Sequence, residues 1–388
     1  MLRCQRSPLG DHRSGTPEPK EQSGAMPIRK TAGPIPDTRA PGTCQDEDRR
    51  FQDAMLQDVS RTFALTIPQL PPRVRDAVSN GYLLCRIVDT IEDDPVLTPA
   101  RKREFCTLFA AVVAGRADPA DFARRLDSAL APAIPQAERL LVRETPRVIA
   151  ITEGFTSAQR RALETCVAVM ADGMAEFQER KDPLGLPTLA DMDRYCYYVA
   201  GVVGEMLTRL FCEYSPPMAR HRERLMPLAV AFGQALQMTN ILKDIWEDRA
   251  RGACWLPRDV FAHYGFDLAH LASGAGDPGF ARGLGHLLGV AHAHARQALQ
   301  YVLLVPAEET GVRNFCLWAL GMAVLTLRKI DRQRDFRSGQ DVKITRRSVK
   351  ATIAVSRFAV RKDWLLRALF YTAWAGTPLP SPLVSRDA

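Results

Sequence analysis

The sequence predicts an all-α fold built as a single large helical domain. Between about Arg49 and Trp374, apolar residues recur at spacings of three and four, which is the periodicity of helices that bury one face. Strand-like alternation bounded by turns is scarce. Three helix starts carry capping sequences: Thr98-Pro99, Thr156 with Gln159, and Thr188 with Asp191. These observations favour helices throughout the body of the chain.

The chain divides by composition into a central body and flanking segments. Residues 1–48 are rich in Pro, Gly, Ser, Thr and charge, with almost no apolar periodicity, so we expect a disordered tail there. Residues 49–345 carry the helical periodicity of the main domain. Residues 346–376 form a basic and apolar helical segment, and residues 377–388 are expected to form a second disordered tail. No internal repeat at a fixed period is present.

The charge and the cysteines exclude several classes of protein. The formal net charge is +8, but the basic residues form no long blocks interleaved with aromatics, so nucleic acid is not an expected partner. The nine cysteines are scattered and odd in number, which predicts reduced, mostly buried thiols rather than disulfides or a zinc site. We find no apolar stretch long enough to span a bilayer and no secretory signal, so we expect a cytoplasmic protein.

The first acidic motif lies within residues 82–94. On a helix, Asp89, Glu92 and Asp93 stand at i, i+3 and i+4, so their three carboxylates share one face. Arg86 lies one turn earlier on this face, and Tyr82 lies one turn earlier again. The positions between them are apolar, which predicts that the helix packs into the core.

The second acidic motif lies within residues 232–248. Gln237, Asn240, Asp244 and Asp248 form one polar stripe at spacings of three and four, surrounded by apolar neighbours. This pattern predicts a helix that is buried on most sides, with a polar stripe facing an interior space.

Carboxylate clusters in two apolar helices predict a divalent cation. Burying several like charges without a partner is very costly. Hard oxygen ligands without Cys or His favour Mg²⁺, or Mn²⁺, over zinc. Magnesium often bridges carboxylates to substrate phosphates, so two such helices facing each other would hold a diphosphate between them. The alternative is that each cluster is a solvated helix face, which is common for one motif and less so for two.

A bound diphosphate also needs basic groups, and the candidates are Arg61, Arg86 and Lys243. Spacing alone does not distinguish these residues from ordinary surface cations. Phe63 and Phe315 are candidates for lining an apolar pocket, where aromatic faces stabilise cations, although most phenylalanines are simply core residues.

The segment from residue 195 to 204 combines tyrosines with glycines. Gly201 and Gly204 within a helical run permit the close approach of another helix or a bend in the backbone. Tyr195 and Tyr198 either present hydroxyl groups to a cavity or serve as aromatic residues of the core.

Together, these segments resemble the squalene/phytoene synthase family, and most closely its squalene synthases of eukaryotic type. The resemblance covers about residues 50–350, in the family's order. The matching stretches are residues 60–63, 82–94, 173–177, 195–204, 237–248, 314–316 and 342–344.

This resemblance implies an isoprenoid-synthase fold with a central cavity between the two acidic motifs and with residues 49–345 as the catalytic domain. It implies a Mg²⁺-dependent prenyltransferase that joins two molecules of farnesyl diphosphate into presqualene diphosphate. NADPH then reduces this intermediate to squalene, a step of sterol or hopanoid biosynthesis. We expect the protein to act as a monomer.

The resemblance also implies roles for individual residues, by motif position. The metal ligands would be Asp89, Glu92, Asp93, Asn240, Asp244 and Asp248. The residues that bind the substrate would be Arg61, Arg86, Gln237, Asn240 and Lys243. The catalytic group would be Tyr195, which assists proton transfer in the first half-reaction, with Tyr82, Phe63 and Phe315. The NADPH-binding residues would be Lys343 and Arg346.

Some positions depart from the family pattern. Lys243 stands where Arg is usual, and Ala253 and Thr345 stand where basic residues are usual. Ala319-Leu320 replaces a usual Pro-Gln pair. These departures affect the reductive half-reaction more than the condensation, so the first alternative is a synthase that omits the reduction and makes presqualene diphosphate, dehydrosqualene or phytoene. A non-catalytic helical protein that binds isoprenoids is the second.

The C-terminal segment has two interpretations. Relatives of eukaryotic type end in a membrane-spanning helix, whereas here the apolar run of residues 364–375 is too short to span and contains Arg367. Basic residues precede this run: Arg346, Arg347, Lys350, Arg357, Arg361 and Lys362. The segment would either lie on the inner surface of a membrane, as a peripheral attachment, or dock on the core as a terminal helix.

Overall fold

The computed structural model describes residues 41–60, 62–180 and 182–376, with side chains from residue 46 onward. Within these ranges the chain is helical and forms no β-strand, apart from an isolated bridge between Leu186 and Pro257. The all-α prediction is therefore confirmed.

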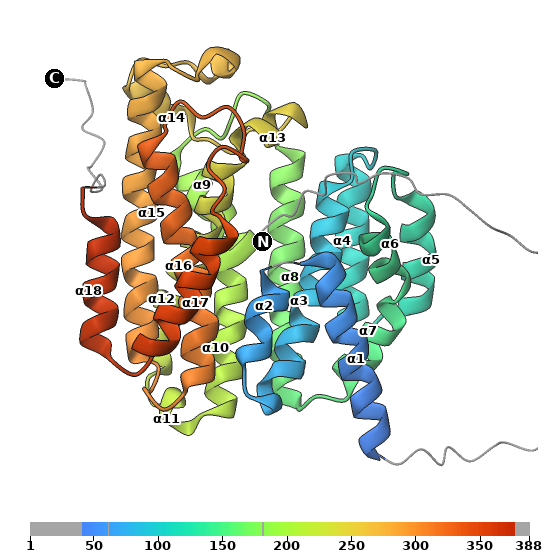
Figure 1. The fold of residues 1–388 in the computed structure, drawn as a ribbon. Helices are drawn as coiled ribbons and strands as arrows, with labels where there is room; N and C mark the ends of the chain where they lie inside the picture. Colours follow the sequence, from blue (N-terminus) through green and yellow to red (C-terminus); the bar gives the residue numbers. More distant parts are fainter. Residues whose placement is uncertain (1–40, 61, 181, 377–388) are drawn as a thin grey trace, which may run out of the picture.

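The helices follow one another with short connections (Figure 1). The first half of the chain forms α1 (Pro41–Val59), α2 (Phe63–Thr66), η1 (Ile67–Gln69), α3 (Pro72–Asp93), α4 (Pro99–Val113), α5 (Pro119–Ala129), α6 (Gln136–Arg143), α7 (Thr145–Glu153), α8 (Ser157–Glu179) and α9 (Leu189–Cys196). The second half forms η2 (Tyr197–Gly201), α10 (Val202–Tyr214), α11 (Pro216–Ala219), α12 (Arg222–Lys243), α13 (Ile245–Ala250), α14 (Arg258–His263), η3 (Leu268–Ser273), α15 (Pro278–Leu304), α16 (Thr310–Arg332), α17 (Arg346–Ala359) and α18 (Asp363–Trp374).

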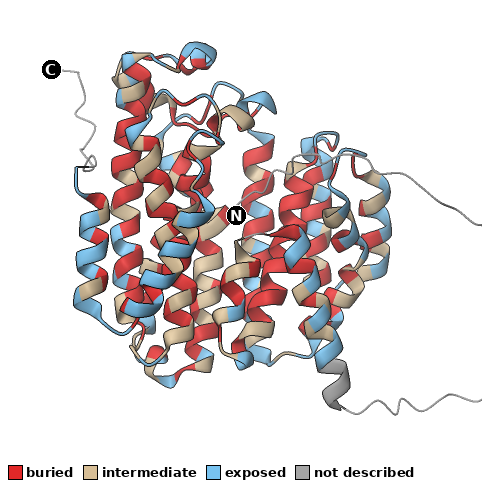
Figure 2. Ribbon diagram, in the orientation of Figure 1, coloured by how far each residue is buried: buried red, intermediate tan, exposed pale blue. Residues whose placement is uncertain are grey.

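Two helices organise the bundle. Helix α12 packs against α10, α15 and α16, and helix α8 packs against α3, α4 and α10. Figure 1 shows the long helices side by side, with α5 and α18 at opposite edges of the molecule. Figure 2 shows that buried residues fill the faces on which these helices meet. One continuous core therefore runs through the bundle.

The predicted helix starts are confirmed. The Thr98 hydroxyl accepts a hydrogen bond from the backbone N–H of Arg101 at the start of α4. Thr156 and Thr188 both form complete capping boxes, with Gln159 and Asp191 respectively. Each cap satisfies backbone donors that a helix leaves unpaired at its N-terminus.

The boundary of the N-terminal tail needs a correction. Residues 41–48, expected to be part of the disordered segment, belong to helix α1. Proline is favourable in the first turn of a helix, and α1 begins at Pro41. Further along this helix, Arg49 forms a bidentate pair with Asp76 of α3 at 3.0 and 2.8 Å, which fastens α1 to the bundle.

Helices α12 and α16 are long and apolar enough to cross a membrane by length and composition alone. The expectation that no stretch reaches that length is therefore wrong on these criteria. Both helices are mostly buried inside the protein: 67% of the apolar 18-residue stretch of α12 and 72% of that of α16 are buried. Their apolar character is accounted for by the core, which makes them weak evidence for a membrane span.

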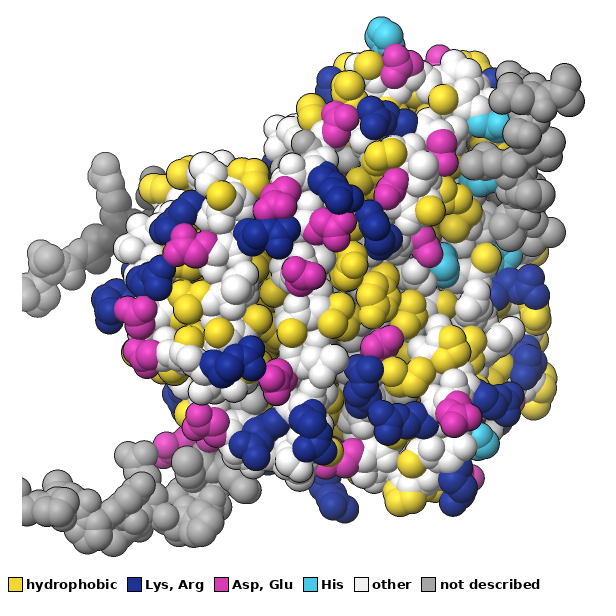
Figure 3. Space-filling model, turned by 180° about the vertical axis from the view of Figure 1, so that it is seen from behind, with side chains coloured by type: hydrophobic (Ala, Val, Ile, Leu, Met, Phe, Trp, Pro, Cys, Tyr) yellow, Lys and Arg dark blue, Asp and Glu magenta, His cyan; other side chains and the backbone are white. Residues whose placement is uncertain are grey.

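The remaining composition-based predictions concern thiols and charge. All seven cysteines whose side chains the structure describes are free and buried, as expected, while Cys4 and Cys44 lie outside that part of the chain. Figure 3 shows basic and acidic side chains interspersed on the face opposite that of Figure 1.

Candidate active site

An apolar cavity of about 700 Å³, open mouth included, lies between α10, α12 and α16. Most of its wall consists of aliphatic and aromatic side chains from α2, η2, α10, α12, α15 and α16. The polar exceptions are the amides of Gln237 and Asn240 and the hydroxyl of Tyr301. The Tyr301 hydroxyl lies 3.0 Å from the Thr208 hydroxyl, so its polarity is satisfied within the wall. The two amides of α12 therefore form the polar part of an otherwise apolar cavity.

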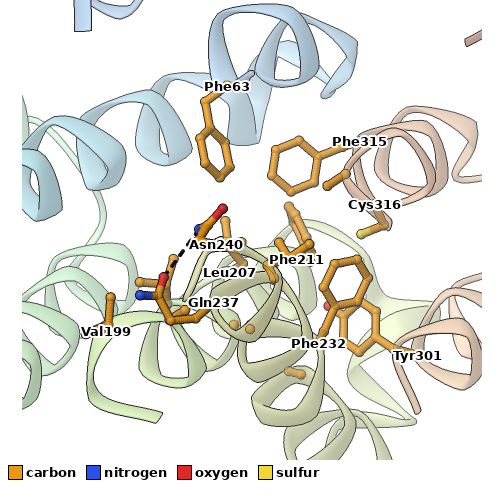
Figure 4. Close-up of a pocket in the computed structure, with 17 residues that line it drawn as sticks. Phe63, Val199, Leu207, Phe211, Phe232, Gln237, Asn240, Tyr301, Phe315 and Cys316 are labelled. Atoms are coloured by element: carbon orange, nitrogen blue, oxygen red, sulfur yellow. Dashed lines mark hydrogen bonds between the residues drawn. The ribbon is translucent and has the colours of Figure 1, made fainter. Parts of the chain in front are cut away.

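The two predicted aromatic residues both line this cavity (Figure 4). The rings of Phe63 and Phe315 have centroids 6.4 Å apart and approach the cavity from different helices, α2 and α16. Phe211 continues the row at 6.0 Å from Phe315, and the ring of Tyr82 of α3 lies 5.0 Å from that of Phe63, tilted by 39°. This row connects the helix of the first acidic motif to the cavity. Its ring faces provide the electron density that stabilises a cation in a dry site.

Glycines allow the cavity walls to pack closely, as the sequence predicted for Gly204. A Cβ atom added at Gly204 would lie 2.1 Å from the Ala229 carbonyl oxygen on α12, and one at Gly233 would lie 2.1 Å from that of Ala200. Residues from Tyr197 to Gly201 form a π-helix, a local widening of the backbone that is frequent at functional sites. Of the two possibilities that the sequence left open, the close approach of another helix is therefore the one that the structure shows.

The first acidic motif occupies the last turns of α3. Asp89 is buried and lies 3.7 Å from the Arg86 guanidinium, which also donates a hydrogen bond to Glu138 of α6. Burial works against the charged form of Arg86, but Glu138 and Asp89 outweigh it and raise the pKa of the guanidinium above its ordinary value. Arg86 is thus a fixed cation beside Asp89 rather than a surface residue.

Glu92 points toward a different set of neighbours. Its Oε1 atom accepts hydrogen bonds from the Tyr195 hydroxyl at 3.1 Å and from the Gln178 amide at 3.0 Å. Lys102 donates to the Glu92 carbonyl oxygen and lies 3.3 Å from the Gln178 amide oxygen. Glu92 therefore joins α3 to α8 and α9 through buried polar contacts.

Tyr195 also connects the two halves of the site. Its ring stacks on Trp255, with centroids 4.0 Å apart and planes inclined by 7°. Trp255 follows α13, whose Asp248 carbonyl accepts a hydrogen bond from the backbone N–H of Ala253 at 2.9 Å. Through Tyr195, the end of the first acidic motif contacts the loop that follows the second.

The second acidic motif does not form one continuous helix. Helix α12 ends at Lys243 and α13 begins at Ile245, with Asp244 between them at φ −100° and ψ 19°. Helix-like hydrogen bonds still pass through Asp244, from its N–H to the Asn240 carbonyl and from the Asp248 N–H to its own carbonyl, both at 2.8 Å. Backbone angles in this sparsely populated region recur at active sites.

The amides and carboxylates of this motif have distinct surroundings. Asn240 donates to Gln237 at 3.4 Å, and the Oδ1 atom of Asn240 is buried without a hydrogen-bond partner. Lys243 pairs with Asp244 at 2.9 Å, and Asp248 pairs with Arg251. A buried amide oxygen that lacks a donor usually signals a missing ligand, ion or water.

Glu247 anchors a loop over this motif. Its Oε1 atom accepts hydrogen bonds from the Gly339 N–H at 2.9 Å and the Ser338 hydroxyl at 3.3 Å. A Cβ atom at Gly339 would lie 3.1 Å from Asp244 Oδ1, so the loop between α16 and α17 packs directly against the acidic turn. This loop carries Lys343.

Other predicted residues lie at the periphery. Lys343 is exposed and its ammonium lies 3.3 Å from the Gln340 amide oxygen, while Arg346 is exposed at the first position of α17. Neither residue lines the cavity. The Tyr82 hydroxyl donates to the Val59 carbonyl at 3.3 Å, and burial raises its pKa to about 12. Arg61 lies outside the described residues.

The oxygen-rich donor set fits magnesium that is held partly by substrate. Among the side chains that the structure describes, no three His, Cys, Asp or Glu residues gather closely enough to form a complete metal cage. Magnesium keeps several waters and is usually bound by one or two carboxylates together with phosphate oxygens, so a complete cage is not required. The unpartnered Asn240 oxygen, flanked by Asp244, suits such an arrangement.

Some residues of this site were not foreseen from the sequence. Glu138, Gln178 and Trp255 come from distant segments and carry no local signal. Glu247 did carry one, because Asp244, Glu247 and Asp248 repeat the spacing of Asp89, Glu92 and Asp93. In both motifs the glutamate binds a neighbouring segment, either α8 and α9 or the loop after α16.

Comparison with known proteins places this site in a wider context. The squalene/phytoene synthase family model matches residues 56–348. Squalene synthase BSS of Botryococcus braunii is 33% identical over 297 residues, which are 73% of this chain and 59% of that relative. The squalene synthase of Eremothecium gossypii is 31% identical over 279 residues, 70% of this chain and 60% of that relative. The chain thus spans about three fifths of the length of these curated relatives.

Solved structures agree on the fold. A ligand complex of TcSQS superposes with a TM-score of 0.69 and 26% identity, covering 88% of this chain and 94% of that one. A dehydrosqualene synthase in complex with a ligand superposes with a TM-score of 0.62 at 18% identity, covering 86% of this chain and all of the other (100%). The expectation of an isoprenoid-synthase fold is confirmed.

Proposed function

Because this chain belongs to the squalene/phytoene synthase family, we propose that it joins two molecules of farnesyl diphosphate head to head and reduces the product to squalene. The product of the condensation is presqualene diphosphate, and NADPH is the proposed reductant. The names of the relatives, which are squalene synthases, and the family match over residues 56–348 support this proposal.

One observation carries this proposal. The cavity is apolar along most of its length and has amides at one end, on the helix that leads into the second acidic motif. A prenyl chain suits the apolar part, and a diphosphate suits the end where Asn240, Lys243 and Asp244 gather. The first motif meets the same region through the contact of Tyr195 with Glu92 and Trp255.

The protein's own groups would prepare the first half-reaction. Asp89, Asp93, Asn240, Asp244 and Asp248 are the proposed magnesium ligands, and bound magnesium would neutralise the charge on the departing diphosphate. Arg86, fixed by Glu138, adds a permanent positive charge beside Asp89. Glu92 stays a proposed ligand of the same set, and its Oε1 atom also holds the Tyr195 hydroxyl.

In this condensation the C–O bond of one allylic diphosphate breaks, and its first carbon bonds to the double bond of the second molecule. A proton is then lost as the cyclopropane ring closes. The Tyr195 hydroxyl is the proposed first acceptor of that proton, because it is buried and hydrogen-bonded to the Glu92 carboxylate. Phe63 and Phe315 would stabilise the cation through their ring faces and exclude water.

The second half-reaction places other demands on the protein. The remaining diphosphate leaves, the cyclopropyl cation rearranges, and a hydride is delivered by NADPH. Lys343, on the loop that Glu247 holds against Asp244, and Arg346, at the start of α17, are the proposed contacts for the phosphate of NADPH.

A synthase that omits the reduction is a second candidate, and one observation favours it. Lys343 faces solvent beside Gln340, and neither it nor Arg346 reaches the cavity. Ala253 and Thr345 also lack the charge that the family pattern supplies. The same cavity and acidic motifs would then release presqualene diphosphate or a dehydrosqualene-type product.

Product analysis distinguishes these candidates. Purified protein is incubated with farnesyl diphosphate and Mg²⁺, with and without NADPH, and the lipids are separated by chromatography. We expect squalene only in the presence of NADPH. The same unreduced product under both conditions would favour the second candidate, and the complete absence of turnover would favour a non-catalytic isoprenoid-binding protein.

A further inference from the structure

Exposed apolar side chains gather on the last two described helices. Eight large hydrophobic side chains are exposed among the residues that the structure describes. Five of these eight lie between residues 355 and 371. They are Val355, Phe358, Trp364, Leu369 and Tyr371. Trp364 and Phe358 are 70% and 69% exposed. Single exposed hydrophobics are normal on soluble proteins, but a cluster with aromatics indicates a binding surface.

Helix α18 does not need these residues for its own packing. Its inner face is formed by Leu366, Phe370 and Trp374, which are all buried. Trp374 stacks on His292 of α15 with ring centroids 4.0 Å apart. Figure 2 shows α18 at the edge of the bundle, with exposed residues along its outer side. The helix is therefore docked on the core and also presents a second, free face.

Positive charge surrounds the exposed aromatics. Residues 346–376 contain seven Lys or Arg residues and a single acidic residue, Asp363. Asp363 is already paired with the buried Arg313 at 2.7 Å. The Lys362 ammonium lies 3.9 Å from the centre of the Phe358 ring, at the corner where α17 meets α18. The exposed apolar groups and the cations therefore share one surface.

We propose that this C-terminal surface, formed by Val355, Phe358, Arg361, Lys362, Trp364, Arg367, Leu369 and Tyr371, binds the headgroup layer of an anionic lipid membrane. Trp and Tyr beside Lys and Arg match the depth profile of a membrane interface, where rings enter the acyl boundary and cations meet lipid phosphates. The attachment proposed for this surface is peripheral.

The charge distribution favours a membrane over a second copy of this chain. In a symmetric dimer the same surface would face itself, so Arg361, Lys362 and Arg367 of one copy would approach those of the other. With Asp363 engaged by Arg313, the surface offers no free carboxylate to balance them. An anionic bilayer supplies the missing negative charge, at roughly 1 kcal/mol for each cation near its surface.

This inference deepens the proposed function and rests on it in one respect only. Helices α17 and α18 pack on α16, whose Phe315 and Ala319 line the cavity. Attachment through this surface would place the cavity of an enzyme with an apolar product close to the lipid phase. Lipid binding itself requires no substrate, so its test is independent of catalysis.

The test is sedimentation of the full chain with sucrose-loaded vesicles, in the absence of substrate. One set contains phosphatidylcholine alone and the other contains phosphatidylglycerol as well. We expect binding to the anionic vesicles that weakens as salt is raised. The double variant F358A/W364A should bind at least about tenfold more weakly, since two interfacial anchors are removed. The variant R361E/K362E should lose a comparable amount.

Matched controls come from other surfaces. Val96, in the connection between α3 and α4, is 66% exposed, so V96A removes a similarly exposed apolar group. Arg160 and Arg161 are adjacent exposed cations on α8, so R160E/R161E makes the same charge change elsewhere. Both controls should bind vesicles as the unaltered protein does. Thermal unfolding of all variants should change by no more than a few degrees, because every altered side chain is exposed.

Two results would overturn the proposal. The first is equal binding by the C-terminal variants and their controls. The second is a wild-type dimer in gel filtration that F358A/W364A converts to a monomer, since the surface would then be a self-association site. Turnover of farnesyl diphosphate in detergent is measured in parallel. If no protein, including the unaltered one, turns over farnesyl diphosphate while vesicle binding is intact, the proposed function is contradicted and the proposed membrane-binding surface is not.

Discussion

The Tyr195 hydroxyl donates a hydrogen bond of 3.1 Å to the Glu92 carboxylate, joining α9 to the first acidic motif. Both residues are buried, and the tyrosine ring is held from its other side by Trp255 at 4.0 Å. A phenol fixed in this way keeps its proton position defined. Tyr195 is not among the residues that line the apolar cavity, but its contact suits a group that passes a proton to a carboxylate.

The variant Y195F tests this role. It removes the hydroxyl and keeps the ring that stacks on Trp255, so we expect the formation of presqualene diphosphate to fall by about 100- to 10,000-fold. Reduction of supplied presqualene diphosphate by NADPH should change much less. Both rates are measured by product chromatography. The control Y197F alters a neighbouring half-buried tyrosine and should leave both rates near normal. A parallel decline of both rates in Y195F would indicate a structural role instead.

The acidic residues separate into ligands and structural groups. We expect D89N and D244N each to lower the turnover of farnesyl diphosphate by at least about a hundredfold, because each removes a proposed magnesium ligand. Their thermal unfolding should stay close to that of the unaltered protein. Turnover that is unchanged in both variants would refute the two-motif mechanism.

Asp94 provides the contrasting case within the same motif. Its carboxylate accepts hydrogen bonds from the backbone N–H groups of Val96, Leu97 and Ala131 at 2.8, 2.8 and 2.7 Å. The variant D94N leaves one of these buried donors without an acceptor, which should lower the free energy of unfolding by about 1–3 kcal/mol. Turnover at low temperature should persist. Denaturant unfolding and activity measured on the same sample separate the two effects.

The sequence predicted what depends on local pattern. Helical periodicity, three capped helix starts and the role of Gly204 in close helix packing were predicted from local sequence, and the structure has them. The second motif divides at Asp244, which was not predicted from the sequence. Helix-like hydrogen bonds continue on both sides of Asp244, so the break does not interrupt the helical spacing of the motif. A loop about ninety residues away packs on this turn, and the local sequence does not indicate that contact.

The partners of the buried charges could likewise not be predicted from the sequence. Arg86 reads as a diphosphate ligand or a surface cation, and only the fold brings Glu138 against it. Glu92 shares a helical face with Asp89 and Asp93 by spacing, yet its side chain reaches Gln178 and Tyr195. Periodicity fixes the face on which a residue stands, whereas tertiary packing decides what that face meets.

The contact between α10 and α12 predicts a sharp glycine requirement. In G204A the new methyl group would meet the Ala229 carbonyl oxygen at 2.1 Å, so the helices that wall the cavity must separate. We expect a loss of at least about 1–3 kcal/mol in unfolding free energy, with weaker substrate binding. The control G154A meets nothing closer than 3.4 Å and should be tolerated. A G204A protein as stable as G154A would contradict the close helix packing.

The buried thiols predict slow chemical labelling. Burial raises the pKa of Cys106 and Cys316 to about 12 and that of Cys254 to about 11. Since only the thiolate reacts, a raised pKa lowers reactivity at pH 8, where an ordinary thiol is partly ionised. Peptides containing these residues should label within minutes in denaturant and far more slowly in the native protein, as read by mass spectrometry. Fast native labelling would indicate that these helices open readily.

The Glu247 contact with the loop after α16 gives the last prediction. The carboxylate accepts from Gly339 and Ser338 and so holds the segment that carries Lys343 over Asp244. In E247A the loop loses both hydrogen bonds, and we expect the KM for NADPH to rise severalfold while condensation without NADPH changes less. In E247Q the amide oxygen still accepts from Gly339, so this variant should recover most of the loss.

The comparison of these two variants distinguishes a positioning role from a metal-binding one. A magnesium ligand would be damaged by either change, because an amide is a much poorer ligand than a carboxylate. In that case E247Q would resemble E247A, and both would lose condensation along with reduction. Recovery in E247Q, confined to the NADPH-dependent step, is expected only if the glutamate acts by holding the loop. Steady-state kinetics of both half-reactions in the two variants therefore decide the role of Glu247.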